Sequence, residues 1–268
     1  MLLILGDSGT LVKVLQHRLT LAGFTVVESG YFDEATLNAV ISFQSTNNLV
    51  VDGIVGDKTT AVLLSSDDSR WLSQNDLEQA AADLGVDMAS IHAIKKVESK
   101  GLGFLSDGRP KILYERHVMR RQMQKNGIGK IAISDTIKNF PDLVNSKPGG
   151  YKGGSKEHYR LSLAKTIDQA SALESCSWGL FQIMGYHWKG LGYKSALEFV
   201  ELMHANEGNH WQAFTRFVQA DKKLHRALKD KNWAEFARRY NGPGYKKNRY
   251  DTKLKAAHDS YRPTQQVA

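Results

Sequence analysis

One carboxylate occupies a position where a helix is expected to carry an apolar side chain. A short helix is predicted after Asp87, a suitable N-cap, with Ile91 and Ile94 on its buried face. Because helical residues advance by about 100° each, Glu98 returns almost directly above Ile91 and lies inside the apolar stripe. A desolvated carboxylate disfavours its charged form, so its pKa rises and it can hold and donate a proton near neutral pH. The alternative is a structural Glu98 paired with Lys95, one turn back.

Two further segments have the composition of site walls. Residues 177–185 read Ser-Trp-Gly-Leu-Phe-Gln-Ile-Met-Gly, a small turn that exposes an aromatic ring and an amide. Residues 239–244, Arg-Tyr-Asn-Gly-Pro-Gly, end a helix in a glycine-proline loop. Aromatic rings stack on the apolar face of a sugar and amides bond its hydroxyls, so the two segments suit carbohydrate. The residues predicted to contact substrate or brace Glu98 are Ser177, Trp178, Gln182, Tyr240 and Asn241. Trp178 and Tyr240 could equally belong to the core.

The elements that must position these residues are mainly helical. Apolar periodicity predicts helices at 161–173, 196–206, 211–228 and 233–240. Residues 111–119 fit a short strand or the start of a helix equally well. Residues 139–160, rich in Gly, Pro, Lys and Tyr, predict a surface loop, which is either the lip of a cleft or a solvated insertion. The fold class is therefore predicted as mainly α with little β.

The first sixty or so residues form a separate pattern of three short helical stripes joined by glycine turns. Residues 29–36 and 52–59 share a glycine, an apolar residue and a threonine at matching positions, so one type of turn opens two helices. A polar stretch follows, beginning Ser-Ser-Asp-Asp-Ser. We therefore expect a small domain at 1–64, a linker at 65–74 and a larger domain at 75–268.

Charge differs sharply between these two parts. Residues 1–64 hold three basic and six acidic residues, so the net charge of +8 for the chain places +11 on the remainder. A basic second part predicts an anionic partner, such as a bacterial envelope or a nucleic acid. The paired lysines and arginines are scattered without interleaved stacking aromatics, which favours a solvated face over nucleic-acid binding.

Composition narrows the class of protein further. An apolar content of 41% with 24% charged residues is that of a globular chain with a real core. No stretch reaches the roughly 20 apolar residues of a membrane span, and the apolar start Met-Leu-Leu-Ile-Leu is too short for a signal peptide. The single cysteine, Cys176, excludes an internal disulfide and fits a reducing compartment, most simply as a small buried residue rather than a nucleophile. We expect synthesis in the cytoplasm.

The N-terminal block resembles the three-helix peptidoglycan-binding module of cell-wall enzymes. The resemblance rests on Gly6-Asp7-Ser-Gly9 leading into Val12, Leu15-Gln16 and Leu19, then Gly23-Phe24, Phe32, Thr36, Ala39-Val40, Phe43-Gln44, and Asp52-Gly-Ile-Val-Gly56 with Thr59. It implies binding of a wall glycopeptide without chemistry. Most of the matching positions are equally well explained as core or turn residues, so the ligand contacts stay open.

The larger part resembles the lysozyme-like superfamily, in particular the phage N-acetylmuramidase domain and, more distantly, goose-type lysozymes and lytic transglycosylases. The carriers, over roughly 75–262, are Val97-Glu98-Ser99, Gly108-Arg-Pro-Lys-Ile-Leu-Tyr-Glu115-Arg-His117, residues 177–185, and Tyr240-Asn-Gly-Pro243 with Tyr245. The resemblance implies a modular phage endolysin that cleaves the β-1,4 bond between N-acetylmuramic acid and N-acetylglucosamine. Glu98 would then be the catalytic acid.

The same resemblance implies a setting for the enzyme. An endolysin is made in the host cytoplasm and acts on periplasmic or cell-wall peptidoglycan after release. We expect a monomer without cofactor or metal, whose partner is peptidoglycan and which neither inserts stably into membranes nor binds nucleic acid.

A second catalytic carboxylate is harder to assign. Glu115 is the leading candidate because it lies within the family-like motif, with an ion pair to Arg116 or Arg120 as the alternative. Further possibilities are Asp107, Asp168, Glu174 and Asp251. Hydrolysis needs such a group at a defined separation. A lytic transglycosylase does not, because the muramic 6-hydroxyl attacks internally.

Two other classes remain as rivals. A zinc peptidase or amidase would need clustered ligands, and the nine histidines show no His-Glu-x-x-His or similar spacing. A non-catalytic wall adhesin would bind without releasing reducing ends.

Overall fold

The computed structural model describes residues 2–64, 70–99 and 101–261. The chain divides into two compact units, Met1–Ala93 with Thr252–Ala268, and Ile94–Asp251. Helices dominate both units, and the strands that pair form one small sheet, so the mainly α fold class is confirmed. Of the helices described in these ranges, none combines the length and apolarity of a membrane span.

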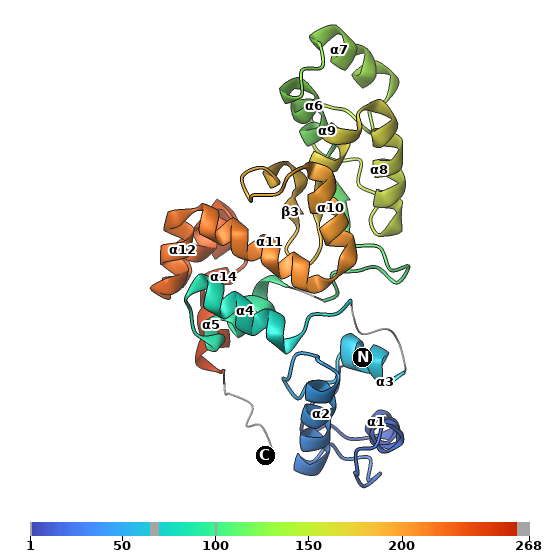
Figure 1. Ribbon diagram of the computed structural model, residues 1–268, viewed down its shortest axis with the longest axis vertical. Helices are drawn as coiled ribbons and strands as arrows, with labels where there is room; N and C mark the ends of the chain where they lie inside the picture. Colours follow the sequence, from blue (N-terminus) through green and yellow to red (C-terminus); the bar gives the residue numbers. More distant parts are fainter. Residues whose placement is uncertain (1, 65–69, 100, 262–268) are drawn as a thin grey trace. The chain divides into compact units, whose positions relative to one another are not determined.

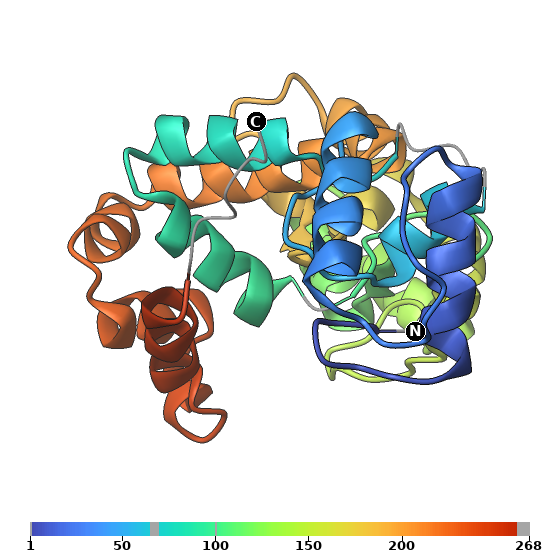
Figure 2. The same ribbon diagram turned by 90° about the horizontal axis from the view of Figure 1, so that it is seen from below.

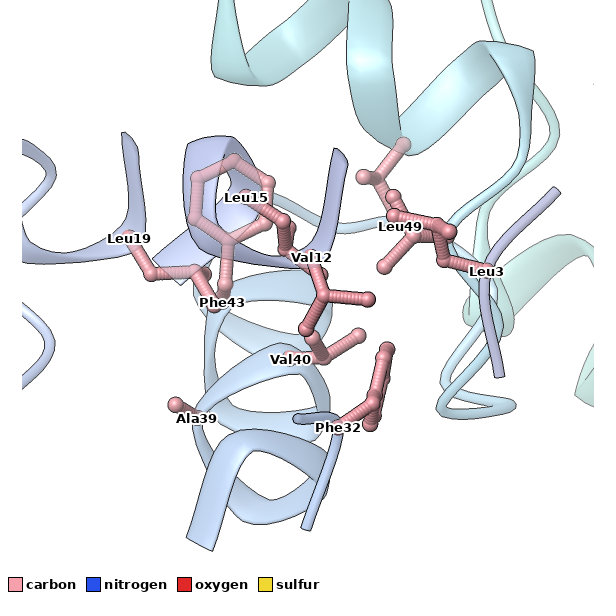
Figure 3. Close-up of a cluster of buried hydrophobic side chains, with 10 residues drawn as sticks. Leu3, Val12, Leu15, Leu19, Phe32, Ala39, Val40, Phe43 and Leu49 are labelled. Atoms are coloured by element: carbon pink, nitrogen blue, oxygen red, sulfur yellow. The ribbon is translucent and has the colours of Figure 1, made fainter. Parts of the chain in front are cut away.

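The first unit begins with three helices that enclose a compact core. They are α1 (Thr10–Leu21), α2 (Glu34–Thr46) and α3 (Asp57–Leu63), followed by α4 (Gln74–Leu84). Figure 2 shows α1 and α2, in blue, running beside each other. Apolar side chains of α1 at the predicted spacing meet those of α2, with Phe43 and Val40 facing Val12 and Leu15 (Figure 3). The three predicted helical stripes of this block are confirmed.

Two buried glutamines hold the glycine turns that the sequence repeats. Gln16 of α1 accepts a hydrogen bond from the Gly30 N–H at 2.8 Å and donates to the Thr36 hydroxyl at 3.0 Å. Gln44 of α2 accepts from the Gly53 N–H at 2.9 Å and donates to the Thr59 hydroxyl at 3.3 Å. The matching glycine and threonine therefore arise from one hydrogen-bonding arrangement built twice.

The predicted linker, residues 65–74, falls partly outside the described residues, since 65–69 are among those the structure does not describe. After it, Ser73 is the N-cap of α4, and Ser73 and Asp76 form the capping box. The helix ends at Gly85, which adopts a left-handed conformation.

Two helices cross the division between the units, namely α5 (Met88–Glu98) and α14 (Tyr250–Asp259). Asp87 caps α5 by accepting a hydrogen bond from the Ser90 N–H at 2.8 Å, which confirms its predicted role.

The second unit packs helices around a short sheet. Its elements are β1 (Ile112–Tyr114), α6 (Arg116–Lys125), α7 (Lys130–Asn139), α8 (Ser155–Ile167), α9 (Gln169–Glu174), β2 (Cys176–Trp178), β3 (Ile183–Met184), η1 (Gly185–His187), α10 (Ala196–Ala205), α11 (Glu207–Ala220), α12 (Lys222–Lys229), α13 (Trp233–Tyr240) and η2 (Pro243–Lys246). Within this unit, α6 to α9 gather at one end and α11 and α12 at the other (Figure 1).

The sheet is antiparallel in the order β1-β2-β3, with Tyr114 opposite Cys176 and Ser177 opposite Met184. Residues 111–119, which fitted strand or helix, contain both, because β1 ends at Tyr114 and α6 begins at Arg116. Cys176 is fully buried and free, as predicted for a small core residue, and burial raises the pKa of its thiol well above the usual value.

Two of the predicted long helices are each divided by an aspartate. Asp168 ends α8 and caps α9, accepting a hydrogen bond from the Ser171 N–H at 2.8 Å. Asp221 caps α12 in the same way through the Leu224 N–H at 3.1 Å. The apolar periodicity runs through both breaks, so it did not reveal them. The acidic cap residues did carry that signal.

Candidate active site

Glu98 is the last residue of α5, directly after the buried Val97. Ile91 and Ile94 below it have no exposed surface, and the Glu98 side chain itself is half-buried. The helical phase argument therefore placed Glu98 correctly beside the apolar face. Its carboxylate is thus bounded by apolar groups on the helix side and must find polar partners elsewhere.

One such partner comes from a segment close to the C-terminal end of the unit's sequence. Asn241, the residue after α13, donates a hydrogen bond from Nδ2 to Oε2 of Glu98 at 2.9 Å, across 143 positions of sequence. Gly242 follows with φ of 81°, a backbone conformation that glycine adopts freely. The turn at Gly242 ends the helix at the point where the Asn241 amide reaches Glu98.

Tyr240 connects the same loop to the hairpin. Its hydroxyl donates to the carbonyl of Phe181 at 3.3 Å, and its ring packs edge-on against Phe214 with centroids 5.4 Å apart. Burial, with the nearby charge of Glu98 as a smaller cause, raises the pKa of Tyr240 well above its usual value. Tyr240 is therefore a neutral phenol at physiological pH, and the three predicted wall segments meet in one place.

The β2–β3 hairpin is held by an unusual turn. Gln182 has φ of 51°, a left-handed conformation that non-glycine residues rarely adopt. Its side-chain oxygen accepts from the Ser177 hydroxyl at 2.7 Å, and its amide donates to the Gly179 carbonyl at 2.8 Å. A second amide contact runs to the carbonyl of Lys111 at 3.3 Å. Ser177 is buried and Gln182 exposed, so Ser177 braces the residue that faces solvent.

Trp178 does not fit the predicted substrate contact. Its side chain is 1% exposed, and its indole N–H donates to the Leu173 carbonyl at 3.2 Å. A ring with no free surface cannot stack on a sugar, so the burial favours the core role that the sequence had left open. Trp211 and Trp233 are likewise buried.

A buried histidine that the sequence reading missed fixes the hairpin from behind. His210 on α11 is 1% exposed, and its ring lies so close to Gly179 that an added Cβ would come within 2.7 Å. Gly103 is equally close, with an added Cβ at 2.6 Å from the same ring. Two glycines, one in each loop, are required by a single imidazole. The glycines alone signalled close packing but not the partner.

Glu115 has a different set of neighbours from Glu98. Its Oε2 accepts a hydrogen bond from the Tyr151 hydroxyl at 2.8 Å and lies 3.1 Å from Nδ1 of His117. Neither residue belongs to the three wall segments. In the part of the chain that the structure describes, neither arginine of the expected alternative, Arg116 or Arg120, forms an ion pair with Glu115. Arg116 instead donates to the carbonyls of residues 141, 147 and 148.

Three other candidate carboxylates have structural partners. Asp107 binds Arg109 at 2.6 Å, and this contact lowers the Asp107 pKa to about 2. Asp168 is the cap of α9. Glu174 accepts from the indole of Trp188 at 2.7 Å. Each partner explains the carboxylate without catalysis.

The loop between α7 and α8, which Tyr151 belongs to, is anchored by a buried ion pair that the sequence did not predict. Glu157 is fully buried and its Oε2 lies 2.7 Å from the Arg160 guanidinium. Its other oxygen accepts from the backbone N–H groups of Lys152 at 2.5 Å and Gly153 at 3.0 Å. Burial opposes ionisation, but these N–H groups and Arg160 together lower the pKa of Glu157. The predicted surface loop is therefore fixed at its C-terminal end by charge.

Within the described residues, no three His, Cys, Asp or Glu side chains are grouped so that they could hold a metal ion.

Comparisons with known proteins identify two families along this chain. The N-acetylmuramidase family matches residues 87–262, and the family described as "Putative peptidoglycan binding domain" matches residues 8–63. None of the curated proteins compared matches this chain. Among solved structures, the crystal structure of a Burkholderia AP3 phage endolysin is 48% identical, covering 97% of this chain and 98% of its own, with a TM-score of 0.85. With a family match over most of its length and Glu98, Tyr240 and Asn241 gathered at one site, this chain belongs to the N-acetylmuramidase family and carries a peptidoglycan-binding module at its N-terminus.

Proposed function

We propose that this chain is a modular phage endolysin that cleaves the β-1,4 bond between N-acetylmuramic acid and N-acetylglucosamine. Glu98 acts as the general acid and protonates the leaving glycosidic oxygen as an oxocarbenium-like state develops. The observation that carries the proposal is the Asn241–Glu98 hydrogen bond, which ties the third predicted wall segment to the first. The 48% identity to a phage endolysin supports the same reading.

The surrounding residues divide the remaining work. Asn241 orients the carboxyl group of Glu98 through one amide hydrogen bond. Tyr240, neutral because it is buried, adds no competing charge beside it. Ser177 and Gln182 hold the hairpin that forms a wall for the sugar, and Trp178 supports that wall from the core.

Glu115 serves in this proposal as the second carboxylate, which activates water or stabilises the cationic sugar. Its contacts with Tyr151 and His117 fix the direction of its carboxylate. The product mass tests this step. Hydrolysis gives fragments with a free reducing end, whereas internal attack by the muramic 6-hydroxyl gives fragments one water lighter and would remove the role assigned to Glu115.

Peptidoglycan is the partner of both units in this proposal, with the N-terminal module retaining the enzyme on the wall. We propose synthesis in the host cytoplasm, action on the wall after release, and a monomeric enzyme, as expected for a lytic enzyme that needs no partner subunit.

Replacing Glu98 by Gln tests the assignment directly. The amide keeps the size and polarity of the side chain but holds no transferable proton, so the rate of reducing-end release from purified walls should fall about 10²- to 10⁴-fold. Sedimentation with insoluble walls should be unchanged, because the module is intact. Glu201→Gln, which removes an exposed carboxylate of α10, is the matched control and should keep full activity. Substantial lysis by Glu98→Gln would refute the mechanism.

A further inference from the structure

A pocket of about 490 Å³ lies beside the end of α7 and one face of α8 in the second unit. Its lining comes from the end of α7, the loop after it and one face of α8, where positions 156, 159, 160 and 163 recur at helical spacing. The volume lies in the range of pockets that bind small organic groups. None of its lining residues belongs to the Glu98 site.

The walls of this pocket are apolar yet open to solvent. Phe140 is 50% exposed, Tyr159 66% and Leu163 39%. Large apolar side chains gathered around a concavity are unusual on a protein surface and typically mark a binding site. The two aromatic rings could cover the apolar parts of a ligand.

The rim of the pocket is cationic. Lys152 and Lys156 line it, and neither forms an ion pair with a described residue. Asp142 also lines it, but its carboxylate lies 3.7 Å from the guanidinium of Arg116. Two ammonium groups are therefore available to a ligand with carboxylates.

A buried cation also belongs to the lining of the pocket. Arg160 is 4% exposed, and its Nη1 and Nη2 groups bind Glu157, the Tyr114 carbonyl and the Asp142 carbonyl. Arg160 therefore holds the frame of the pocket, and the charges open to a ligand are those of the two lysines.

We propose that this pocket binds the acidic peptide stem of peptidoglycan. Lys152 and Lys156 hold stem carboxylates, and Phe140 and Tyr159 contact the aliphatic parts of the peptide. The inference deepens the proposed function and rests on it, since it takes peptidoglycan as the substrate. The glycan offers at most the single lactyl carboxylate of a muramic acid, whereas a peptide stem carries several carboxylates that two ammonium groups can hold. A membrane surface prefers an exposed amphipathic face to a concavity.

The position of the pocket relates the stem to the chemistry. Tyr151, which holds Glu115, directly precedes Lys152. Arg160 donates to the carbonyl of Tyr114, the residue before Glu115, at 3.0 Å. A stem bound in the pocket would stabilise the segments that position Glu115, namely those of Tyr151 and Tyr114. Peptide-bearing glycan would therefore be the better substrate.

The experiment compares reducing-end release, as kcat/KM, from two preparations of the same walls, one peptide-bearing and one stripped of peptide by an amidase. Lys152→Gln with Lys156→Gln removes both charges and keeps the Lys152 N–H that binds Glu157. Two exposed ion pairs are together worth about two- to thirtyfold in binding, so kcat/KM should fall about five- to tenfold on the peptide-bearing walls and stay unchanged on the stripped glycan. Lys223→Gln with Lys229→Gln on α12 removes the same charge elsewhere and should not alter the ratio between substrates.

An equal fall on both substrates, or no change on either, would overturn the peptide site. Should the parent enzyme release reducing ends from neither preparation, the proposed function fails instead. The pocket is then judged by binding alone, comparing a soluble disaccharide-tetrapeptide with the same disaccharide lacking peptide. Equal affinity of the parent for the two probes would also refute the proposal.

Discussion

Each of the two units holds a glycine turn with one buried side chain that accepts two backbone hydrogen bonds. The side chain is an amide in the first unit and a carboxylate in the second. In the N-terminal module, the amide oxygen of Gln44 accepts the N–H groups of two successive residues, Asp52 and Gly53. In the second unit, one carboxylate oxygen of Glu157 accepts those of Lys152 and Gly153. Both side chains are buried, and each holds the backbone of a turn that precedes a helix. We call Gln44 with its two N–H donors the neutral clamp, and Glu157 with its two N–H donors the ionic clamp.

The difference shows what a charge adds and what it requires. A buried amide needs only hydrogen bonds, so the Gln44 clamp is complete once its turn is formed. A buried carboxylate also needs a countercharge, and Arg160 supplies it while bonding two backbone carbonyls of neighbouring segments. The ionic clamp therefore connects more segments of the fold. Removing one of its charged partners should also lower the free energy of unfolding by a larger amount.

Removing the charge from the ionic clamp should have the largest effect. Glu157→Gln leaves the Arg160 guanidinium buried without its counterion, and breaking such a pair costs about 3–5 kcal/mol. Hydrogen exchange of the full chain should show this loss in peptides from β1, α6 and α8. Glu201→Gln on the exposed face of α10 is the control and should stay within about 0.5 kcal/mol of the parent. A loss below 1 kcal/mol would mean that the buried charge of Glu157 adds nothing to the stability of this turn.

Removing the neutral clamp should cost less. Gln44→Ala leaves the buried Gly53 N–H without its acceptor, and a buried unsatisfied group of this kind costs about 1–3 kcal/mol. The same exchange measurement should locate the loss in peptides from residues 34–63. Gln16→Ala should behave alike, because its clamp is built in the same way. Asn38→Ala, on the exposed side of α2, should leave exchange almost unchanged. A loss in the second unit instead would contradict the assignment.

The smallest expected effect is a difference in how the stability contributions of Glu157 and Gln44 depend on pH. The pKa of Glu157 in the folded protein lies below its ordinary value of 4.5, so its contribution is fully present above pH 4.5 and is lost as pH falls through the folded pKa. The stability difference between the parent and Glu157→Gln should therefore shrink below pH 4.5. Gln44 does not titrate, so the difference for Gln44→Ala should keep its size.

Urea unfolding followed by tryptophan fluorescence can measure the Glu157 series, since four of the five tryptophans lie in the second unit. A difference that stayed constant down to pH 3 would indicate that Glu157 is not ionised in the folded protein.

Much of the site could be read from local patterns. The position of Glu98 beside the apolar stripe follows from the helical repeat, and the end of α13 at Tyr240 follows from the glycine-proline loop. The repeated glycine and threonine of the module predicted matching turns, although not the glutamines that hold them. These features involve residues that are close together in the sequence, so the helical repeat of 3.6 residues is enough to predict them.

The partners of those residues could not be read in this way. Trp178 is a core residue whose ring packs beside His204 of α10, later in the chain. The Glu157–Arg160 pair is buried because α8 packs onto β1, where both residues bind the backbone of Tyr114. A run of Gly, Pro and Lys fitted a solvated insertion equally well. Whether a polar residue ends up in solvent depends on which segments pack over it.

By itself, then, the sequence determined which residues could carry chemistry, and the helix that presents Glu98. The tertiary structure alone decided that Asn241, 143 positions away, supplies the hydrogen bond to it, and that Glu115 is held by Tyr151 rather than by an arginine. The physical reason is the distance along the sequence over which each kind of information acts. Periodicity encodes the direction of a side chain relative to its own helix, whereas its partner is fixed only when distant segments close around the same core.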